Sequence, residues 1–436
     1  IYMKRITIIL LAVLLVPAQV AAMTTPFLTA NRPSSGTSNS AVRYMGVMPY
    51  GPGTAAGTNA TEAPMPIAGT FSKLYLRFPT AITAGTSYTV ALMVNNAATS
   101  LSAQITDAGL TAQDTSNTVT VAAGDMVSFR ITPSGTPESN TIFQVGVVFD
   151  ATTSGESPIL SLGSTASTTG TVYASLGSYS VWDATESLRS TVFPTNGAIS
   201  NMYVDLSTAP GVGKTNTITL VLNGTPTSQT CTVSDTATTC TDLTNSVTVA
   251  PGDTVSLQQT PSGTPAGTNI RMGHRFVPTI SGESVMLANA GSHSASATRY
   301  QFTGSLITNQ ATESTTYSIA PIAFTWKDLY IDFNVAPGAG KSRSMVSRIG
   351  GASQTLTAVV SDTATTANDT ANDVSVAAGD LMDWMTVPTG TPDLQVATRV
   401  SAVMYIAPPA ASPPVGQPRF LNLGTMLLNF GKLIIP

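Results

Sequence analysis

The nonapeptide Val247-Thr248-Val249-Ala250-Pro251-Gly252-Asp253-Thr254-Val255 is the middle one of three similar segments in this chain. The same order of two alternating valines followed by Gly-Asp occurs around Gly124, 128 residues before Gly252, and around Gly379, 127 residues after it. Gly-Thr-Pro triplets recur at the same spacing, and Thr-Glu pairs recur at about this spacing. Solenoid repeats usually span about 20 to 50 residues, so this longer period indicates that each copy is a whole domain.

Length and composition agree with three folded domains. A chain of 436 residues corresponds to about three domains of ordinary size, and each copy is long enough to bury its own core. Only 10% of the residues are charged and the net charge is −4. Nucleic acid is therefore excluded as a partner, because phosphate binding needs clustered Lys and Arg.

Each copy has the pattern of β-strands throughout. Residues 74–78, 202–206 and 329–333 alternate apolar and amphipathic side chains, and Gly, Pro, Asn and Asp separate them from further alternating runs. We therefore expect an all-β protein of three tandem antiparallel β-sandwich domains of jelly-roll type, with an apolar C-terminal tail. The expected segments are a signal peptide (1–22), three β-sandwich repeats (23–150, 151–277 and 278–407), a Pro-rich linker (408–419) and the tail (420–436).

The N-terminal segment has the features of a secretory signal peptide. Lys4 and Arg5 precede an apolar run over residues 6–16, and small residues follow at 20–22. The alternative is an uncleaved membrane anchor, but eleven apolar residues are fewer than the roughly 20 that span a bilayer. We expect cleavage after Ala22 and an extracellular or cell-surface location.

The two cysteines of the chain, Cys231 and Cys240, both belong to the second copy. Alanines occupy the matching positions of the other copies. A pair present in one copy of an exported protein predicts a disulfide between neighbouring strands, and closing this ten-residue loop would stabilise the fold by roughly 2 to 3 kcal/mol. The alternative is two free buried thiols.

The sequence predicts no catalytic site. The only histidines, His274 and His293, are confined to the second copy and the join after it, and no Gly-x-Ser-x-Gly motif is present. Glu62, Glu186 and Glu313 recur with the period without a second carboxylate at a fixed offset, so we interpret them as strand-edge or interface residues.

No cofactor is expected, with calcium as the one candidate ion. Asp362, Asp369 and Asp373 lie in a hairpin of the third copy and offer the oxygen ligands that calcium prefers. The alternative is that these residues form turns, in which Asp is common for backbone reasons alone.

The order of motifs within a copy resembles the jelly roll of the tumour-necrosis-factor and complement globular-head family, in its bacterial members. The resemblance is carried by an alternating strand, a second strand ending in Asn223-Gly224, a Thr-rich hairpin, and the Gly-Asp pair that leads into a later strand. It implies a binding or structural module without catalytic residues. Because members of that family form trimers, it also implies that the copies pack either as a pseudo-trimer within one chain or as a string.

The tail after the Pro-rich linker is strongly apolar. Its polar residues fall at helical spacing, which predicts an amphipathic helix that lies in a membrane interface or docks onto a partner. The alternatives are a terminal strand or an unstructured apolar end. The side chains that we expect to anchor the tail are Phe420, Leu423, Leu427, Phe430 and Ile434.

Together these features favour a secreted, non-catalytic structural or adhesive surface protein. Its expected partners are another surface or extracellular protein, a glycan, or further copies of the chain, with membrane contact only through the tail. The alternatives are an array of carbohydrate-binding modules, in which repetition supplies avidity, and a structural protein of a virion.

Overall fold

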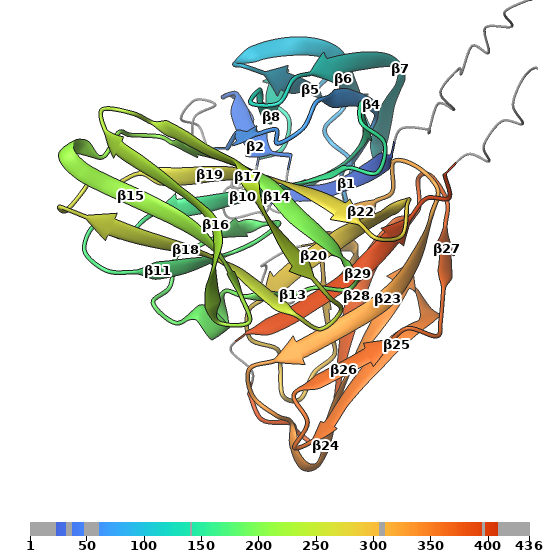
Figure 1. Cartoon of the computed structure of the whole chain (residues 1–436). Helices are drawn as coiled ribbons and strands as arrows, with labels where there is room; N and C mark the ends of the chain where they lie inside the picture. Colours follow the sequence, from blue (N-terminus) through green and yellow to red (C-terminus); the bar gives the residue numbers. More distant parts are fainter. Residues whose placement is uncertain are drawn as a thin grey trace, which may run out of the picture. The chain divides into compact units, whose positions relative to one another are not determined.

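The computed structural model in Figure 1 describes residues 23–31, 37–47, 61–139, 142–304, 310–394 and 397–408. Within these ranges the chain forms β-strands joined by turns, and the helical segments are two single turns, η3 (Glu186–Leu188) and η4 (Glu313–Thr315). The predicted all-β class is therefore confirmed. The expected tail and signal peptide lie outside the described residues.

The first sandwich consists of two antiparallel sheets. Its strands are β1 (Thr24–Asn31), β2 (Arg43–Gly46), β3 (Ala63–Pro64), β4 (Gly69–Arg77), β5 (Ser87–Val94), β6 (Ala97–Thr106), β7 (Thr111–Val121), β8 (Met126–Ser134) and β9 (Phe143–Ala151). One sheet has the order β1-β9-β4-β7, and the other has the order β2-β8-β5-β6, with β3 beside β8.

The second sandwich repeats this plan. Its strands are β10 (Ser157–Thr165), β11 (Val172–Ser175), β12 (Tyr179–Ser180), β13 (Thr191–Val192), β14 (Gly197–Leu206), β15 (Gly211–Leu222), β16 (Thr225–Asp235), β17 (Thr239–Val249), β18 (Thr254–Ser262) and β19 (Asn269–Pro278). The sheets have the orders β12-β10-β19-β14-β17 and β11-β18-β15-β16, with β13 beside β18.

The third sandwich follows the same order again. Its strands are β20 (Glu283–Ala290), β21 (Arg299–Gln301), β22 (Ser318–Ile319), β23 (Phe324–Phe333), β24 (Gly338–Ile349), β25 (Ala352–Asp362), β26 (Thr366–Asp369), β27 (Val374–Val376), β28 (Leu381–Thr389) and β29 (Thr398–Tyr405). The sheets have the orders β20-β29-β23-β26 and β21-β28-β24-β25, in which β27 also pairs with β23 and β22 with β28.

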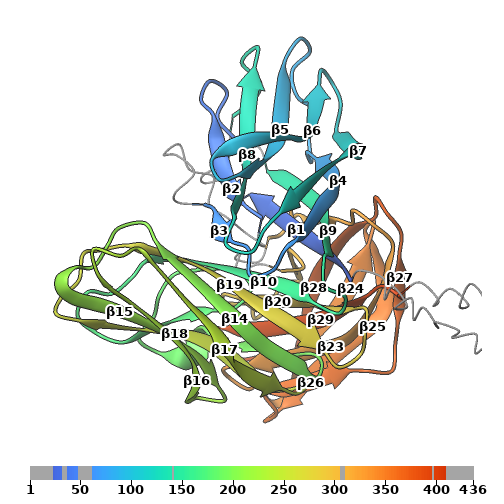
Figure 2. The same ribbon diagram turned by 45° about the horizontal axis from the view of Figure 1, so that its top comes forward.

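All three sandwiches have jelly-roll connectivity. When the eight main strands of each are numbered along the chain, one sheet has the order 1-8-3-6 and the other has the order 2-7-4-5. Consecutive strands thus alternate between two facing layers, except strands 4 and 5, which pair as a hairpin within one sheet; the two layers can be followed in Figures 1 and 2. This is the two-sheet arrangement expected for an eight-stranded jelly roll.

The Gly-Asp pairs of the repeated motif form the turn between strands 6 and 7. Gly252 has a φ of +90°, a conformation that side chains with a Cβ rarely adopt. The Asp253 carboxylate accepts a hydrogen bond from the backbone N–H of Ala250 at 2.8 Å. The Asp side chain thus bonds the amide three residues before it in the chain.

Each sandwich has its own hydrophobic core, and each core includes leucine side chains from the first strand of another sandwich. Leu160 and Leu162 of β10 belong to the core cluster of the first sandwich. Leu287 of β20 belongs to that of the second sandwich, and Leu28 of β1 to that of the third. The first strand of the second sandwich therefore packs on the first sandwich, that of the third sandwich packs on the second, and that of the first sandwich packs on the third.

Candidate functional site

On the outer faces of the 1-8-3-6 sheets, strand 8 is covered by other parts of the chain. In β9 only Asp150 is not fully buried, and in β29 only Tyr405. One face of each strand packs in its own sandwich, and the other meets a short strand of a neighbour, since β9 contacts β22, β19 contacts β3, and β29 contacts β13. The buried charged residues of these three junctions form the candidate site.

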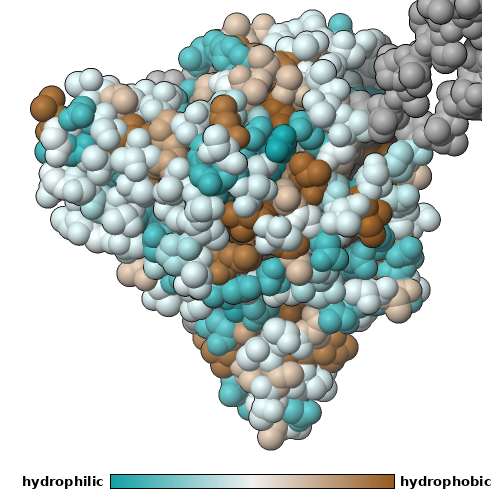
Figure 3. Space-filling view, in the orientation of Figure 1, coloured by the Kyte–Doolittle hydropathy of each residue, from teal (hydrophilic) through white to brown (hydrophobic). Residues whose placement is uncertain are grey.

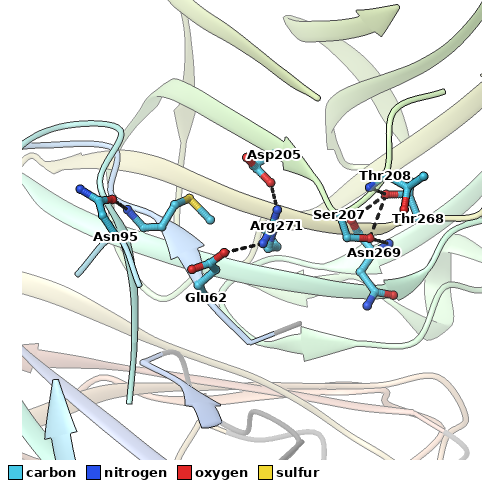
Figure 4. A network of polar contacts seen from close by, with 9 residues as sticks. Glu62, Asn95, Asp205, Ser207, Thr208, Thr268, Asn269 and Arg271 are labelled. Atoms are coloured by element: carbon cyan, nitrogen blue, oxygen red, sulfur yellow. Dashed lines mark hydrogen bonds and ion pairs between the residues drawn. The ribbon is translucent and has the colours of Figure 1, made fainter. Parts of the chain in front are cut away.

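The junction between the first and second sandwiches is organised by Arg271 of β19. Its guanidinium donates to the Glu62 carboxylate of the first sandwich at 2.7 Å and also pairs with Asp205 of β14. Figure 4 shows Arg271 lying between the two carboxylates. Arg271 and Glu62 are each only 5% exposed. Burial raises the pKa of Glu62 above its ordinary value, and the Arg271 guanidinium offsets only part of that shift.

The junction between the second and third sandwiches uses equivalent positions. Arg399 of β29 pairs with Asp332 of β23 at 2.8 Å. It also donates to the Ser190 hydroxyl at 2.7 Å and to the Ser187 carbonyl at 3.4 Å, both in the second sandwich. Burial raises the pKa of Asp332, and the Arg399 guanidinium acts in the opposite direction.

The junction between the third and first sandwiches has different polar residues. Arg77 of β4 donates to the Gln144 side-chain oxygen at 2.6 Å within the first sandwich. It also donates to the Ser314 carbonyl of the third sandwich at 3.4 Å, and its guanidinium lies 5.1 Å from the centre of the Tyr317 ring. The three junctions together link the sandwiches in cyclic order, as the subunits of a trimer are linked.

A crevice lies where the first strands of the three sandwiches approach one another. Its lining includes Pro26 of β1, Pro158 of β10 and Val285 of β20, together with their apolar neighbours and Met404. The Thr25 hydroxyl donates to the Ser157 hydroxyl at 3.1 Å beside it. The lining contains no charged side chain, so the crevice provides apolar contact between sandwiches rather than reactive groups.

The structure does not bring the three candidate calcium ligands together. Among the described residues there is no group of three His, Cys, Asp or Glu side chains that could hold a metal ion. The Asp362 carboxylate accepts the backbone N–H of Gly340 at 2.7 Å, and Asp373 is exposed. Burial would raise the pKa of Asp369, but hydrogen bonds from Thr357, Asn372 and neighbouring amides lower it overall. These contacts are those of turn residues.

Both histidines are buried inside the sandwiches. His274 of β19 is 0% exposed and His293 is 1% exposed. Burial lowers the pKa of each to about 3, so both imidazoles are neutral at physiological pH. Neither imidazole is placed to contact a substrate from solvent.

The predicted disulfide between Cys231 and Cys240 is confirmed. Cys231 lies on β16 opposite Ile218, and Cys240 lies on β17 opposite Val204. The two strands are consecutive in the chain but belong to opposite sheets. The bond therefore fastens the two layers of the second sandwich to each other, rather than two hydrogen-bonded neighbours.

The expected anchoring residues of the tail lie outside the described residues, as does the expected signal peptide. The described part of the chain contains no helix of the length and apolarity needed to cross a membrane.

Sequence reasoning singled out Glu62 as a strand-edge or interface residue, but it missed the other charged residues of the junctions, although the sequence carries a signal for them. Arg77, Asp205 and Asp332 recur at the repeat period, and so do Gln144, Arg271 and Arg399. In a chain with only 10% charged residues, polar positions that recur on strands beside core positions indicate a face that is buried against another domain.

Comparison with known proteins does not identify relatives, because no protein-family model matches the sequence and no curated protein matches it significantly.

Proposed function

We propose that this protein is an exported, non-catalytic structural or adhesive protein in which three jelly rolls act as one pseudo-trimeric head. The observation that carries this proposal is the cyclic set of junctions. Each junction buries a guanidinium on the outer face of a 1-8-3-6 sheet. Such groups are costly to bury without partners, so the junctions favour a fixed arrangement over a flexible string.

The outward surface supports a role in binding other molecules rather than in catalysis. The face drawn in Figure 3 is mostly pale, the colour of residues with intermediate hydropathy such as Thr, Ser and Gly, with separate brown patches. On β15 and β16, the hydroxyls of Thr217 and Thr232 pair at 2.9 Å, as do those of Thr219 and Thr230. An uncharged hydroxyl-bearing surface suits packing against another protein, a glycan or a further copy of this chain.

The disulfide supports an oxidising compartment, because such bonds persist in exported proteins and are rare in the cytosol. Together with the expected signal peptide, it favours an extracellular or cell-surface location, with the apolar tail as the tether.

Electron microscopy of the exported full-length protein, combined with light scattering, tests the proposal. We expect three-lobed particles with the mass of one chain that are recovered with a cell surface or a larger assembly.

If the protein were instead a carbohydrate-binding array, the free chain in solution would bind members of a glycan panel. That outcome is disfavoured because every described Trp, Phe and Tyr is buried or half-buried, whereas sugars usually stack on exposed rings. Incorporation into virus particles would support the virion alternative and overturn the proposal.

A further inference from the structure

Arg77 is a buried cation at the junction between the third and first sandwiches. It is 9% exposed, and its neighbour Gln144 is 0% exposed. Among the described residues its hydrogen-bond partners are the Gln144 side-chain oxygen and the Ser314 carbonyl, both uncharged, and its ring contact is Tyr317. Burying a charge without a counter-charge is strongly unfavourable in a protein.

At the equivalent positions of the other two junctions, each guanidinium faces at least one carboxylate. Arg271 faces Asp205 and Glu62, and Arg399 faces Asp332. Arg77 stands at the position of the two aspartates, with Gln144 at the position of the two arginines. This junction therefore keeps one positive charge and lacks the carboxylate that neutralises it elsewhere.

A second observation points to the same place. The side-chain Nε2 of Gln144 is buried and has no hydrogen-bond partner among the described residues. Its oxygen accepts from Arg77, so the unused N–H donors belong to the same amide that contacts the guanidinium. Burial lowers the pKa of Arg77, and only the Tyr317 phenol acts on it in the opposite direction. The junction thus combines excess positive charge with unused donors.

We propose that a small monovalent anion of halide size binds at this junction, held by the Arg77 guanidinium and the Gln144 amide. Such an ion accepts charge-assisted hydrogen bonds from both groups. It supplies the negative charge that Asp205 and Asp332 supply at the other junctions. The ion would stabilise the one junction whose two sandwiches are not consecutive in the chain.

Thermal unfolding of the full-length protein tests this site. The probes are sodium chloride and sodium gluconate at equal ionic strength, because gluconate is too large for a buried site. We expect Tm to rise by a few degrees, in a saturable manner, with chloride alone. Superimposable melting curves in the two salts would overturn the proposal.

A variant at the junction and a matched control away from it sharpen the test. Gln144→Glu supplies a carboxylate beside Arg77, so the chloride dependence should disappear while the protein stays folded. The matched control is Gln104→Glu, which makes the same charge change at an exposed position of the other sheet, and it should keep the dependence. A chloride effect that survives in Gln144→Glu would refute the site.

A crystal soaked in bromide provides a direct readout on the unaltered chain. We expect an anomalous peak within hydrogen-bond distance of both Arg77 and Gln144. A bromide-soaked structure without that peak would contradict the proposal even if chloride raised Tm, because the stabilisation would then arise elsewhere.

Discussion

Replacing His274 with valine should remove about half of the acid sensitivity that the two buried histidines give this protein. Valine is the residue at the equivalent position of the first sandwich, Val147, which is also buried in the core. His274 has no hydrogen-bond partner for either ring nitrogen among the described residues. The substitution therefore removes an uncompensated polar group and should not lower stability at neutral pH.

The magnitude follows from the pKa of His274. Burial lowers this pKa to about 3 in the folded state, whereas an unfolded histidine has a pKa of about 6.5. Between these values the unfolded state binds a proton that the folded state does not, so the free energy of unfolding falls as the pH falls. Between pH 7.5 and pH 5.0 the expected loss is about 2 kcal/mol for this residue.

Urea unfolding at the two pH values, followed by tryptophan fluorescence, measures this loss. His274→Val should reduce the difference between pH 7.5 and pH 5.0 by about 2 kcal/mol relative to the unaltered protein. His293, whose pKa is also lowered to about 3, serves as an internal control because its contribution should remain. A variant with the same pH dependence as the unaltered protein would refute the reasoning.

Four further outcomes are expected. Reducing the native disulfide should lower the free energy of unfolding by roughly 2 to 3 kcal/mol. The double substitution Ala103→Cys and Ala112→Cys should form a matching disulfide in the first sandwich, because Ala103 and Ala112 have the register of the native cysteines. Free-thiol labelling of the unfolded variant checks this, and two titratable new thiols would contradict it. Glu62→Gln should cost about 1 to 3 kcal/mol in urea unfolding, because it weakens a buried charge-assisted hydrogen bond to Arg271, and an unchanged midpoint would show that Asp205 alone satisfies the guanidinium. Deleting residues from Phe420 onward should leave the sandwiches folded by circular dichroism but release the protein from its surface or assembly, and an unchanged distribution between fractions would remove the tethering role of the tail.

The features that were predictable from sequence are those that depend on local pattern. Alternation over residues 74–78 and 202–206 predicted strands, and both segments lie in or overlap β4 and β14. The paired occurrence of Cys231 and Cys240 predicted the disulfide, because two cysteines close in sequence and confined to one copy have few other uses.

The junctions were not predictable to the same degree, since they depend on contacts between distant segments. Arg271 and Glu62 are separated by 209 positions, and nothing local to either residue indicates its partner. Alternation places Asp205 on the outer face of its sheet, but the sequence pattern of an outer face is the same whether solvent or another domain covers that face. Only the periodic recurrence of polar residues at these positions distinguishes the two cases.

The short connections between sandwiches have a consequence for the concentration dependence of assembly. Residues 152–156 join β9 to β10, and residues 279–282 join β19 to β20. Such brief tethers hold neighbouring domains at effective concentrations in the millimolar range. A trimer of separate subunits dissociates as its molar concentration falls, whereas this chain carries all three subunits at a fixed stoichiometry. A protein released into a large external volume would therefore keep its threefold head at any dilution.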